Sequence, residues 1–482
     1  MGFMNSAKKI PLIVAATLVV AAFFYFAQAQ EPDIRQDARA ALRGSVEFFR
    51  TTVSTEGGYL WRYSADLQYR EGEGLVTDSM AWVQPPGTPS VGEALLVAYQ
   101  STDDQYYIDA AQETAHALVA GQLESGGWDY RIEFDSDKRG KYRYRIDGSP
   151  GKRNVTTLDD DTTQSALRFL MRIDKALEFK DETIHHAVTY ALDKLLGAQY
   201  PNGAWPQRFT GPPEVQKYPI LKASYPDAWS RRYQKKNYTN YYTFNDNVVA
   251  DMVDTLFLAR DIYNDNQYDR AARKAGDFII LAQMPEPQPA WAQQYSADMH
   301  PTWARKFEPP AVTGGESQGV LRTLLEIYRK TGDEKYLEPV PRALNYLENS
   351  VLADGRMPRF LELRTNKPLY FTLDYELTYD NSNMPTHYSF LNRHRLKSIR
   401  QAYEKLKENG PPAAAPEPRQ RSASSRLKAN VIKIIDALDE RGAWVEPGKL
   451  KYHDEENPTT HIIDCRTFAK NIRTLSEFVA IP

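Results

Sequence analysis

The sequence predicts an all-α protein built from repeated helical hairpins, and three observations lead to this prediction. A loop that carries an aromatic residue recurs about every 65 to 85 residues. Between these loops, apolar residues fall at helical spacing, as they do over 166–173 and again over 184–195. Capping residues precede the first helix of each interval. Hairpins of this kind cannot bury their apolar stripes alone, so we expect them to stack into either a solenoid or a closed ring of inner and outer helices.

The recurring loops share a common form, in which glycine often precedes an aromatic residue and arginine often follows it. They are Gly57–Arg62, Gly126–Arg131, Gly203–Arg208, Pro289–Gln294 and Gly355–Arg359. The capped helix starts between them are Thr88–Ser90, Asp159–Thr162, Asn245–Asn247 and Gly314–Ser317. Each loop joins an outer helix to the next inner helix, so all the loops and all the capped starts should lie at one rim.

Two long insertions and a proline-rich segment interrupt this repeat. Residues 209–243 and 360–386 are rich in tyrosine and proline and show no clear helical period, which favours irregular loops over the same rim. We expect the helical domain to cover residues 30–410. We interpret residues 411–424 as a Pro/Ala/Ser-rich linker, and 425–482 as a C-terminal helical cap that packs on the domain.

The N-terminus has the pattern of an export signal. Two lysines precede the apolar run Ile10–Ala27, and Ala27–Ala29 has the small-x-small form of a cleavage site. We therefore expect residues 1–29 to be a signal peptide and the mature protein to be periplasmic or extracellular. The run is close to the length of a membrane span, so an uncleaved anchor stays an alternative and would be the chain's sole membrane contact.

Composition excludes several classes of partner and site. The formal net charge is −3 and the pI is about 6.3, so no overall basic field is present to bind nucleic acid. The single cysteine, Cys465, excludes an intrachain disulfide and a cysteine-based zinc site. We expect a monomer that binds a polyanion locally.

Acidic residues beside the helix starts form a candidate metal site. Asp159, Asp160 and Asp246 supply hard oxygen ligands, which suit Ca²⁺ better than zinc or copper. Ordinary helix capping is the alternative, but the run Asp159–Asp161 exceeds what capping requires, and neighbouring carboxylates would repel one another without a cation.

Arginines and tryptophans complete a candidate groove for an acidic polysaccharide. Arg208, Arg305 and Arg359 lie in or near the rim loops, where a guanidinium can bind a sugar carboxylate with two hydrogen bonds. Trp128 and Trp205 would offer faces for sugar rings to stack on. The alternatives are surface ion pairs for the arginines and core packing for the tryptophans.

Five segments, in order, resemble the motifs of polysaccharide lyase family ten, the pectic acid lyases. They are Leu158–Gln164, Gln199–Gln207, Thr243–Asn247, Trp303–Pro310 and Pro358–Phe360. The resemblance covers about residues 85–400. It implies an α/α toroid, an incomplete double ring of helical hairpins with long irregular loops at one rim. It also implies a pectate lyase that cleaves polygalacturonate by calcium-dependent β-elimination and releases a 4,5-unsaturated uronide end.

The resemblance also implies roles for particular residues. Asp159 and Asp246 match acidic residues of the family's calcium and substrate site, and Asp160 stands where an asparagine is usual. Arg305 matches the arginine that acts as base on the C5 proton, and Arg359 matches one that holds a substrate carboxylate. We expect Asn245, which lies in the same motif as Asp246, and Arg208 to contact the substrate. Because an arginine base needs a neutral fraction, an alkaline pH optimum is expected.

The sequence departs from the family pattern at one turn. Where the family tends to place a further arginine in a Gly-Arg-Asp-Gly turn, this chain has Phe371–Asp374, without arginine or glycine. The departure implies weaker activity, a different preference along the polymer, or loss of catalysis with binding retained. A non-catalytic pectin-binding protein is thus one alternative.

Two further alternatives share the expected architecture. A glycoside hydrolase would need two carboxylates across one bond, and Asp159 with Asp246 or Glu316 could form such a pair. A terpenoid cyclase would fit the spacing of Gln122 with Trp128 and of Gln199 with Trp205, but a hydrocarbon substrate would need a largely apolar cavity rather than an arginine-rich rim.

Overall fold

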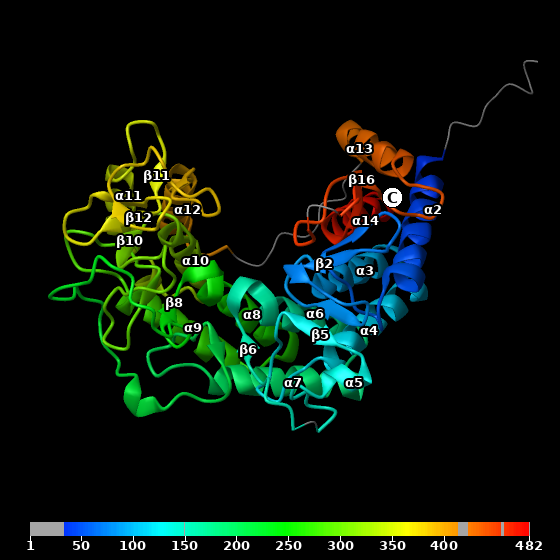
Figure 1. Cartoon of the computed structure of the whole chain (residues 1–482), viewed down its shortest axis with the longest axis horizontal. Helices are drawn as coiled ribbons and strands as arrows, with labels where there is room; N and C mark the ends of the chain where they lie inside the picture. Colours follow the sequence, from blue (N-terminus) through cyan, green and yellow to red (C-terminus); the bar gives the residue numbers. More distant parts are fainter. Residues whose placement is uncertain (1–32, 149, 413–422, 455–456, 482) are drawn as a thin grey trace, which may run out of the picture.

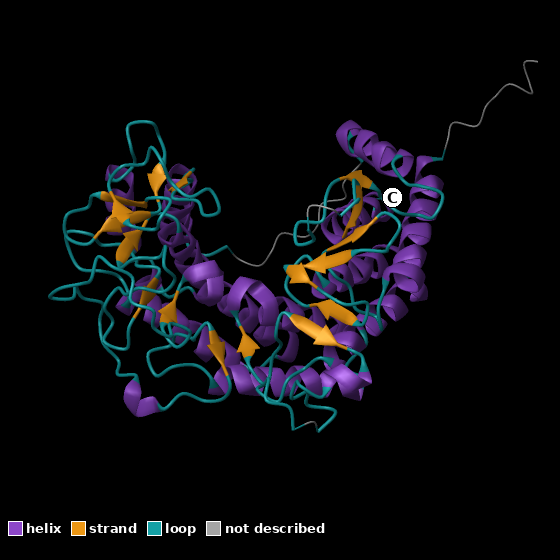
Figure 2. Cartoon of the chain, in the orientation of Figure 1, coloured by secondary structure: helices purple, strands orange, loops and turns teal. Residues whose placement is uncertain are grey.

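The computed structural model describes residues 33–148, 150–412, 423–454 and 457–481. The proposed signal peptide and most of the proposed linker lie outside these ranges. The described chain forms a curved double layer of helices, an open α/α toroid (Figures 1 and 2). The all-α prediction and the choice of a ring over a straight solenoid are both confirmed. Among the described residues, no helix is both long and apolar enough to cross a membrane.

Two rows of helices build the arc. The inner row follows its concave side in Figure 1 and consists of α14 (Cys465–Ala480), α3 (Thr88–Thr102), α6 (Thr162–Ala176), α8 (Val248–Tyr263), α10 (Glu316–Thr331) and α12 (Leu396–Asn409). The outer row consists of α13 (Ser425–Asp436), α2 (Ile34–Phe48) with the π-helical turn η1 (Phe49–Val53), α4 (Gln105–Ala120), α7 (Glu182–Gly197), α9 (Asn266–Leu281), and the turn η5 (Glu334–Tyr336) with α11 (Val340–Asn349). Apolar stripes of the two rows meet in one continuous core.

Short strands in the rim loops connect neighbouring units of the arc. A strand before an inner helix pairs antiparallel with a strand that follows the next aromatic loop. These pairs are β4 (Met80–Trp82) with β5 (Arg131–Glu133), β6 (Thr156–Thr157) with β7 (Arg208–Phe209), β8 (Tyr242–Thr243) with β9 (Gln294–Tyr295), and β10 (Ala311–Thr313) with β12 (Phe360–Glu362). The repeated pairing holds the starts of the inner helices in register.

The remaining elements lie in the insertions and loops. They are β2 (Arg70–Gly72), β3 (Gly74–Leu75), α5 (Ser136–Arg139), η2 (Asp159–Asp161), η3 (Val215–Lys217), η4 (Asn245–Asn247), β11 (Met357–Pro358), β13 (Pro368–Phe371), β14 (Leu377–Thr378), β15 (Leu391–Asn392) and β16 (Glu446–Pro447). Strands β10, β12, β13 and β14 form one sheet over a second, smaller apolar cluster around Trp303 and Phe371. Most of the insertion at 209–243 is irregular.

The C-terminal segment forms a further helical unit rather than a simple cap. Strand β17 (His461–Asp464), directly before α14, pairs with β1 (Arg62–Ser64), the counterpart of the pairs above. The indole nitrogen of Trp444 donates to the carbonyl of Ile434, as Trp128 does to Leu118. Helix α14 packs against α3 and α2, so the chain's last inner helix precedes its first outer helix around the arc. The opening of the ring therefore lies between α12 and α13 (Figure 1).

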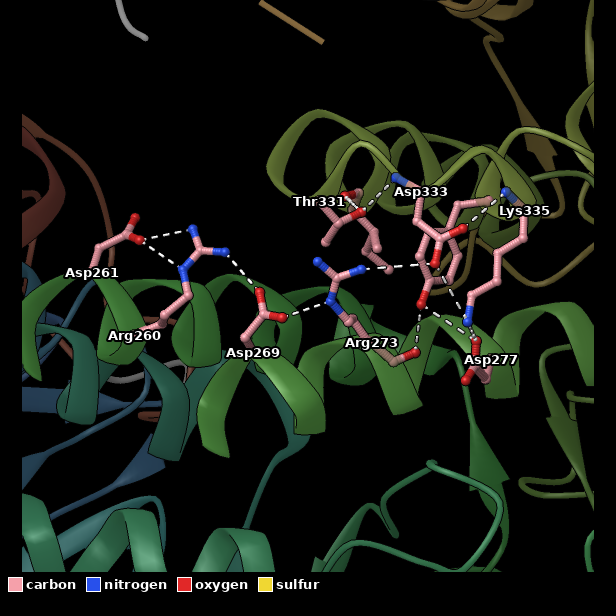
Figure 3. A network of polar contacts seen from close by, with 10 residues as sticks. Arg260, Asp261, Asp269, Arg273, Asp277, Thr331, Asp333 and Lys335 are labelled. Atoms are coloured by element: carbon pink, nitrogen blue, oxygen red, sulfur yellow. Dashed lines mark hydrogen bonds and ion pairs between the residues drawn. The ribbon is translucent and has the colours of Figure 1, made fainter. Parts of the chain in front are cut away.

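Charged side chains join the outer helix α9 to the turn after α10, at the rim opposite the aromatic loops. Arg273 lies between Asp269 at 2.6 Å and Asp333 at 3.7 Å, and Lys335 pairs with Asp277 at 2.7 Å (Figure 3). Such exposed pairs contribute at most about 1 kcal/mol each. They position this turn rather than supply most of the stability.

Candidate active site

The candidate site begins at the starts of two neighbouring inner helices. The turn η2 precedes α6 and the turn η4 precedes α8, and the two turns lie in contact. Asp160 and Asp161 have φ of 51° and 60°, and Asp246 and Asn247 have φ of 47° and 59°. Aspartate and asparagine tolerate this left-handed conformation better than most residues do. The conformation is common to both turns, and it brings the two acidic motifs together.

The structure gathers Asp159, Asp160 and Asp246 into one cluster. Each offers a carboxylate oxygen, and the three oxygens lie within 4.8 Å of one another. Asp159 is 7% exposed and accepts hydrogen bonds from the hydroxyl of Tyr130 at 3.0 Å and the amide of Gln207 at 2.8 Å. Asp159 is thus fixed by neutral donors, while the other two carboxylates face it.

The cluster is electrostatically unfavourable by itself. Burial, then the charge of Asp159, raises the pKa of Asp160 to about 6. Burial, then the charges of Asp159 and Asp160, raises the pKa of Asp246 to about 8. Three carboxylates this close need a proton or a cation between them.

Asp161, the third member of the aspartate run, does not join the cluster. Its carboxylate accepts two hydrogen bonds from Arg168 of α6, at 2.6 and 2.7 Å. Arg168 also donates to the hydroxyl of Thr255 on α8. Asp161 therefore belongs to a contact between α6 and α8 on their inner side.

The three arginines named as candidates from the sequence lie near the cluster. Arg208, on β7, lies 3.9 Å from Asp159. Arg305 lies 3.7 Å from Asp246. Arg359, between β11 and β12, is mostly buried and ion-paired with Glu316 at the start of α10.

Glu308 is a site residue that no pattern in the sequence indicated. Its buried carboxylate accepts from Arg305 at 2.6 Å and from the hydroxyl of Tyr388 at 2.9 Å. Burial opposes the charge of Arg305, but the hydrogen bond and charge of Glu308 outweigh it and raise the pKa of that guanidinium. Glu308 stood within the motif Trp303–Pro310, but no feature of the sequence showed that it faces the arginine three residues earlier.

Several buried polar atoms around the cluster have no protein partner in the described part of the chain. They are Arg208 Nε, Asn245 Oδ1, Arg305 Nε, Glu316 Oε2 and Arg359 Nε. Asn245 is 3% exposed, and its amide nitrogen donates to Asp246. Unpaired buried polar atoms are costly, so their concentration here is typical of a binding site rather than of a packed core.

The two tryptophans expected to stack on sugar rings do not lie at the surface. Trp128 and Trp205 are fully buried, and their indole nitrogens donate to the carbonyls of Leu118 and Leu195 at 2.7 and 2.8 Å. They hold the end of an outer helix to the loop that follows it. The prediction that they bind substrate is wrong, because the helical repeat needs these side chains inside its core.

The acidic cluster fits a calcium ion by the chemistry of its donors. Calcium takes six to eight oxygen ligands in flexible geometry. The cluster offers three carboxylates, and Asn245, next to Asp246 in the chain, has a side-chain oxygen without a partner among the described residues. Among the described residues, this is the one group of histidine, cysteine or acidic side chains with ligand atoms close enough to hold a metal.

This chain is similar to one protein family and to several solved structures. Residues 122–327, less than half of the chain, match the family of pectic acid lyases. No curated protein matches the chain. A solved family 10 polysaccharide lyase from Cellvibrio cellulosa has 22% sequence identity over 66% of this chain and 97% of its own, with a TM-score of 0.45.

Other solved helical rings are similar over more of the chain. A cellobiose 2-epimerase from Bacillus thermoamylovorans has 13% identity over 92% of this chain and 98% of its own, with a TM-score of 0.45. An α-1,6-mannanase of Salegentibacter has 10% identity over 93% of this chain and its whole own length, with a TM-score of 0.40. The family match confirms the resemblance that the ordered motifs indicated.

Proposed function

We propose that this chain, a polysaccharide lyase by its match to the pectic acid lyases over residues 122–327, is a calcium-dependent pectate lyase that cleaves polygalacturonate by β-elimination. The observation that carries the proposal is the cluster of Asp159, Asp160 and Asp246 with arginines beside it. The cluster supplies a place for a cation, and the arginines supply donors for the carboxylates of an acidic polymer.

The proposed reaction removes the C5 proton of a galacturonate unit and breaks the bond between C4 and the glycosidic oxygen. A calcium ion held by Asp159, Asp160 and Asp246 would draw charge from the substrate carboxylate and make the neighbouring C5 proton more acidic. Arg359 and Arg208 would bind substrate carboxylates and stabilise the charge that develops there. The electron pair of the C–H bond forms the C4–C5 double bond, and the leaving oxygen takes a proton from solvent.

Arg305 is the proposed base for the C5 proton. It lies beside Asp246 at the edge of the cluster, and burial favours its neutral form. The ion pair with Glu308 opposes this role, because it raises the pKa of the guanidinium. Arg305 would therefore act through a small neutral fraction, and the rate should be highest at alkaline pH.

Ultraviolet absorbance of polygalacturonate incubated with the protein tests the reaction. An increase from the 4,5-unsaturated uronide, present with calcium and stopped by a chelator, is the expected result. New reducing ends without that absorbance would instead indicate a hydrolase that uses two carboxylates.

The role of Arg305 needs a matched pair of variants. Arg305→Ala should lose turnover and retain substrate binding, measured by calorimetry. Arg356→Ala is the control, since Arg356 lies in an adjacent rim loop, is exposed and pairs with Asp354. Full activity of both Arg305→Ala and Arg305→Lys would place the base elsewhere.

A non-catalytic pectin-binding protein is the second candidate, and two observations favour it. Glu308 holds Arg305 in its charged form, and the turn Phe371–Asp374, which lacks the arginine that the related lyases tend to have there, has an exposed Leu373. Binding of polygalacturonate without any change in absorbance at alkaline pH would select this candidate.

The proposal also covers where the protein is located and whether it is a monomer. We propose an exported, periplasmic or extracellular monomer, on the basis of the signal-like residues 1–29 and the polymeric substrate. Mass determination of the secreted protein tests both points, since cleavage near residue 29 changes the chain mass and a dimer would double the native mass.

A further inference from the structure

An arginine-lined cleft opens beside the acidic cluster. It has a volume of about 390 Å³ and lies between the start of α8, the first turns of α10 and the loop before α12. Asp246 and Arg359 border it on one side, so it is continuous with the candidate active site. Arg322, Arg393 and Arg395 line the rest of the cleft.

Within the described part of the chain, these three guanidinium groups have no counterion. None of them has an ion pair or a side-chain hydrogen bond with another described residue. The two carboxylates that line the cleft do not supply one either, because Glu316 is paired with Arg359, and Asp246 belongs to the acidic cluster and lies 3.7 Å from Arg305. The cleft therefore carries an excess of positive charge in a protein whose formal net charge is −3.

Like charges in the cleft act on one another. Partial burial lowers the pKa of Arg322, and the positive charge of Arg395 lowers it further. Holding two guanidinium groups on one cleft costs free energy unless an anion lies between them. An oxygen anion with two acceptor atoms, such as a carboxylate, matches the donors of a guanidinium.

The elements that carry these arginines are fixed to one another. The backbone nitrogen of Arg395 donates to the side-chain oxygen of Gln318 on α10 at 2.8 Å. Strand β15, just before Arg393, pairs with β11, just before Arg359. The backbone nitrogen of Arg359 donates to the carbonyl of Phe390 at 2.8 Å. The cleft is therefore a built surface rather than a chance meeting of flexible side chains.

Two glycines, one at the N-cap of α10 and one in its first turn, leave room in the cleft. Gly315 and Gly319 lie one turn apart and line it. A Cβ added at Gly319 would meet nothing nearer than Asn247 Oδ1 at 3.6 Å, which is an ordinary contact. Glycine inside a helix costs stability relative to alanine, so its presence here favours a role in leaving room for a ligand.

We infer that this cleft is an adjoining subsite that binds the carboxylate of a second uronate unit, next to the unit held at the acidic cluster, through Arg322, Arg393 and Arg395. The inference rests on the proposed function for the identity of the ligand as a polymer of uronates. It adds that recognition extends from α8 toward α12 along the rim, and that this part of recognition needs no metal.

Calorimetric binding of hexagalacturonate in the presence of a chelator tests the subsite without turnover. The wild-type protein should bind the oligomer, and the double variant Arg322→Gln/Arg395→Gln should bind it about tenfold more weakly or worse. A fully methyl-esterified oligomer, which has no carboxylates, should bind both proteins equally. Arg329→Gln is the matched control, because Arg329 lies on the same helix and is paired with Glu326.

Gly319→Met tests the same space without removing a charge. The side chain would fill the cleft, and the affinity for hexagalacturonate should decrease while the melting temperature stays the same or increases. With calcium, both sets of variants should raise KM for polygalacturonate and leave kcat nearly unchanged.

The outcomes separate this subsite from the proposed reaction. Equal affinity of the wild-type protein and the arginine double variant, or no binding by the metal-free wild type, would overturn the subsite even if the lyase reaction is observed. Carboxylate-dependent binding that the double variant loses would support the subsite even if no unsaturated product forms.

Discussion

Asp160 and Asp246 occupy the same position at the starts of two successive inner helices, and both have a left-handed backbone, with φ of 51° and 47°. Each is the middle residue of a three-residue turn that contacts the other turn. The ring geometry brings α6 and α8 side by side, so two acidic residues separated by 86 positions in the sequence come to face each other. Together with Asp159 they form the cluster on which the proposed calcium site rests.

Removing one of these carboxylates should weaken calcium binding. Asp246→Asn keeps the size of the side chain and its place in the turn but removes one charged ligand. We expect the calcium affinity, measured by calorimetry, to decrease about tenfold or more, and turnover to decrease with it. Asp251→Asn, on α8 but outside the cluster, is the control and should retain wild-type affinity. Unchanged calcium affinity in Asp246→Asn would remove Asp246 from the metal site.

The stability of the metal-free protein should decrease as the pH rises from about 4 to about 8. In the folded protein, burial and the neighbouring aspartates raise the pKa of Asp246 to about 8 from its ordinary value of 3.8. The folded state therefore holds a proton that the unfolded state has released, and this advantage is lost as the pH approaches the folded pKa.

Melting temperatures in a chelator at pH 5 and pH 8 measure this effect. Asp246→Asn should lose less stability over this interval than the wild type, and calcium should restore the wild-type protein at pH 8. Burial, then the charge of Asp161, also raises the pKa of Asp251 to about 8. Asp251 therefore contributes to the same loss of stability, and Asp246→Asn retains that contribution. An identical pH dependence in wild type and Asp246→Asn would contradict the raised pKa.

Glu308→Gln should shift the pH–rate profile if Arg305 is the base. The substitution keeps a hydrogen-bond acceptor for Arg305 but removes the negative charge that raises the pKa of the guanidinium. The neutral fraction of Arg305 at a given pH would then increase, so the rising limb of the profile should move to lower pH. If Arg305 binds a carboxylate as a cation instead, the limb should stay in place while KM changes.

Trp205→Phe should change stability rather than substrate binding. The substitution removes the hydrogen bond to the carbonyl of Leu195 and leaves a gap in a fully buried site. We expect the free energy of unfolding to decrease by about 1–3 kcal/mol. Activity per folded molecule at a temperature well below melting should stay near the wild-type value. A rise in KM without a loss of stability would restore the stacking role expected from the sequence.

Phe468→Ala tests the placement of the C-terminal helix. The rings of Phe468 on α14 and Phe49 in η1 are stacked with centroids 3.6 Å apart, and both are buried. Denaturant unfolding should show a loss of about 3–5 kcal/mol, the usual cost of such a truncation in a core. Phe179→Ala, at a side chain that is 42% exposed, should cost much less. Equal effects of the two substitutions would mean that α14 is not part of the central core.

The helical class and the starts of most inner helices follow from the sequence because they depend on local chemistry. Apolar spacing, capping residues and loop glycines each act within a few residues, and these signals place the starts of α3, α6, α8 and α10. The same signals put the acidic motifs and the aromatic loops at one rim. The ordered motifs then indicated the kind of enzyme, although no single motif would have done so.

Burial and long-range pairing were decided by the tertiary structure alone. The tryptophans of the loops are core residues because each indole reaches back to the preceding outer helix, a contact that an aromatic pattern does not distinguish from an exposed ring. Asp161 is neutralised by Arg168 while its neighbour Asp160 faces the cluster, because a turn points successive side chains in different directions.

The last helical unit of the ring is the clearest example of long-range pairing that the sequence does not predict. Gly442 and Trp444 repeat the form of the earlier loops. The linker interrupts the spacing of the repeat, however, so the sequence did not indicate that α14 lies beside α3. Strand β17 pairs with β1, nearly 400 residues earlier in the chain. Local sequence determined which residues form helices, turns and acidic motifs, whereas closure of the chain's two ends into one arc determined which of them meet, because contacts between distant residues depend on the packing of the whole ring.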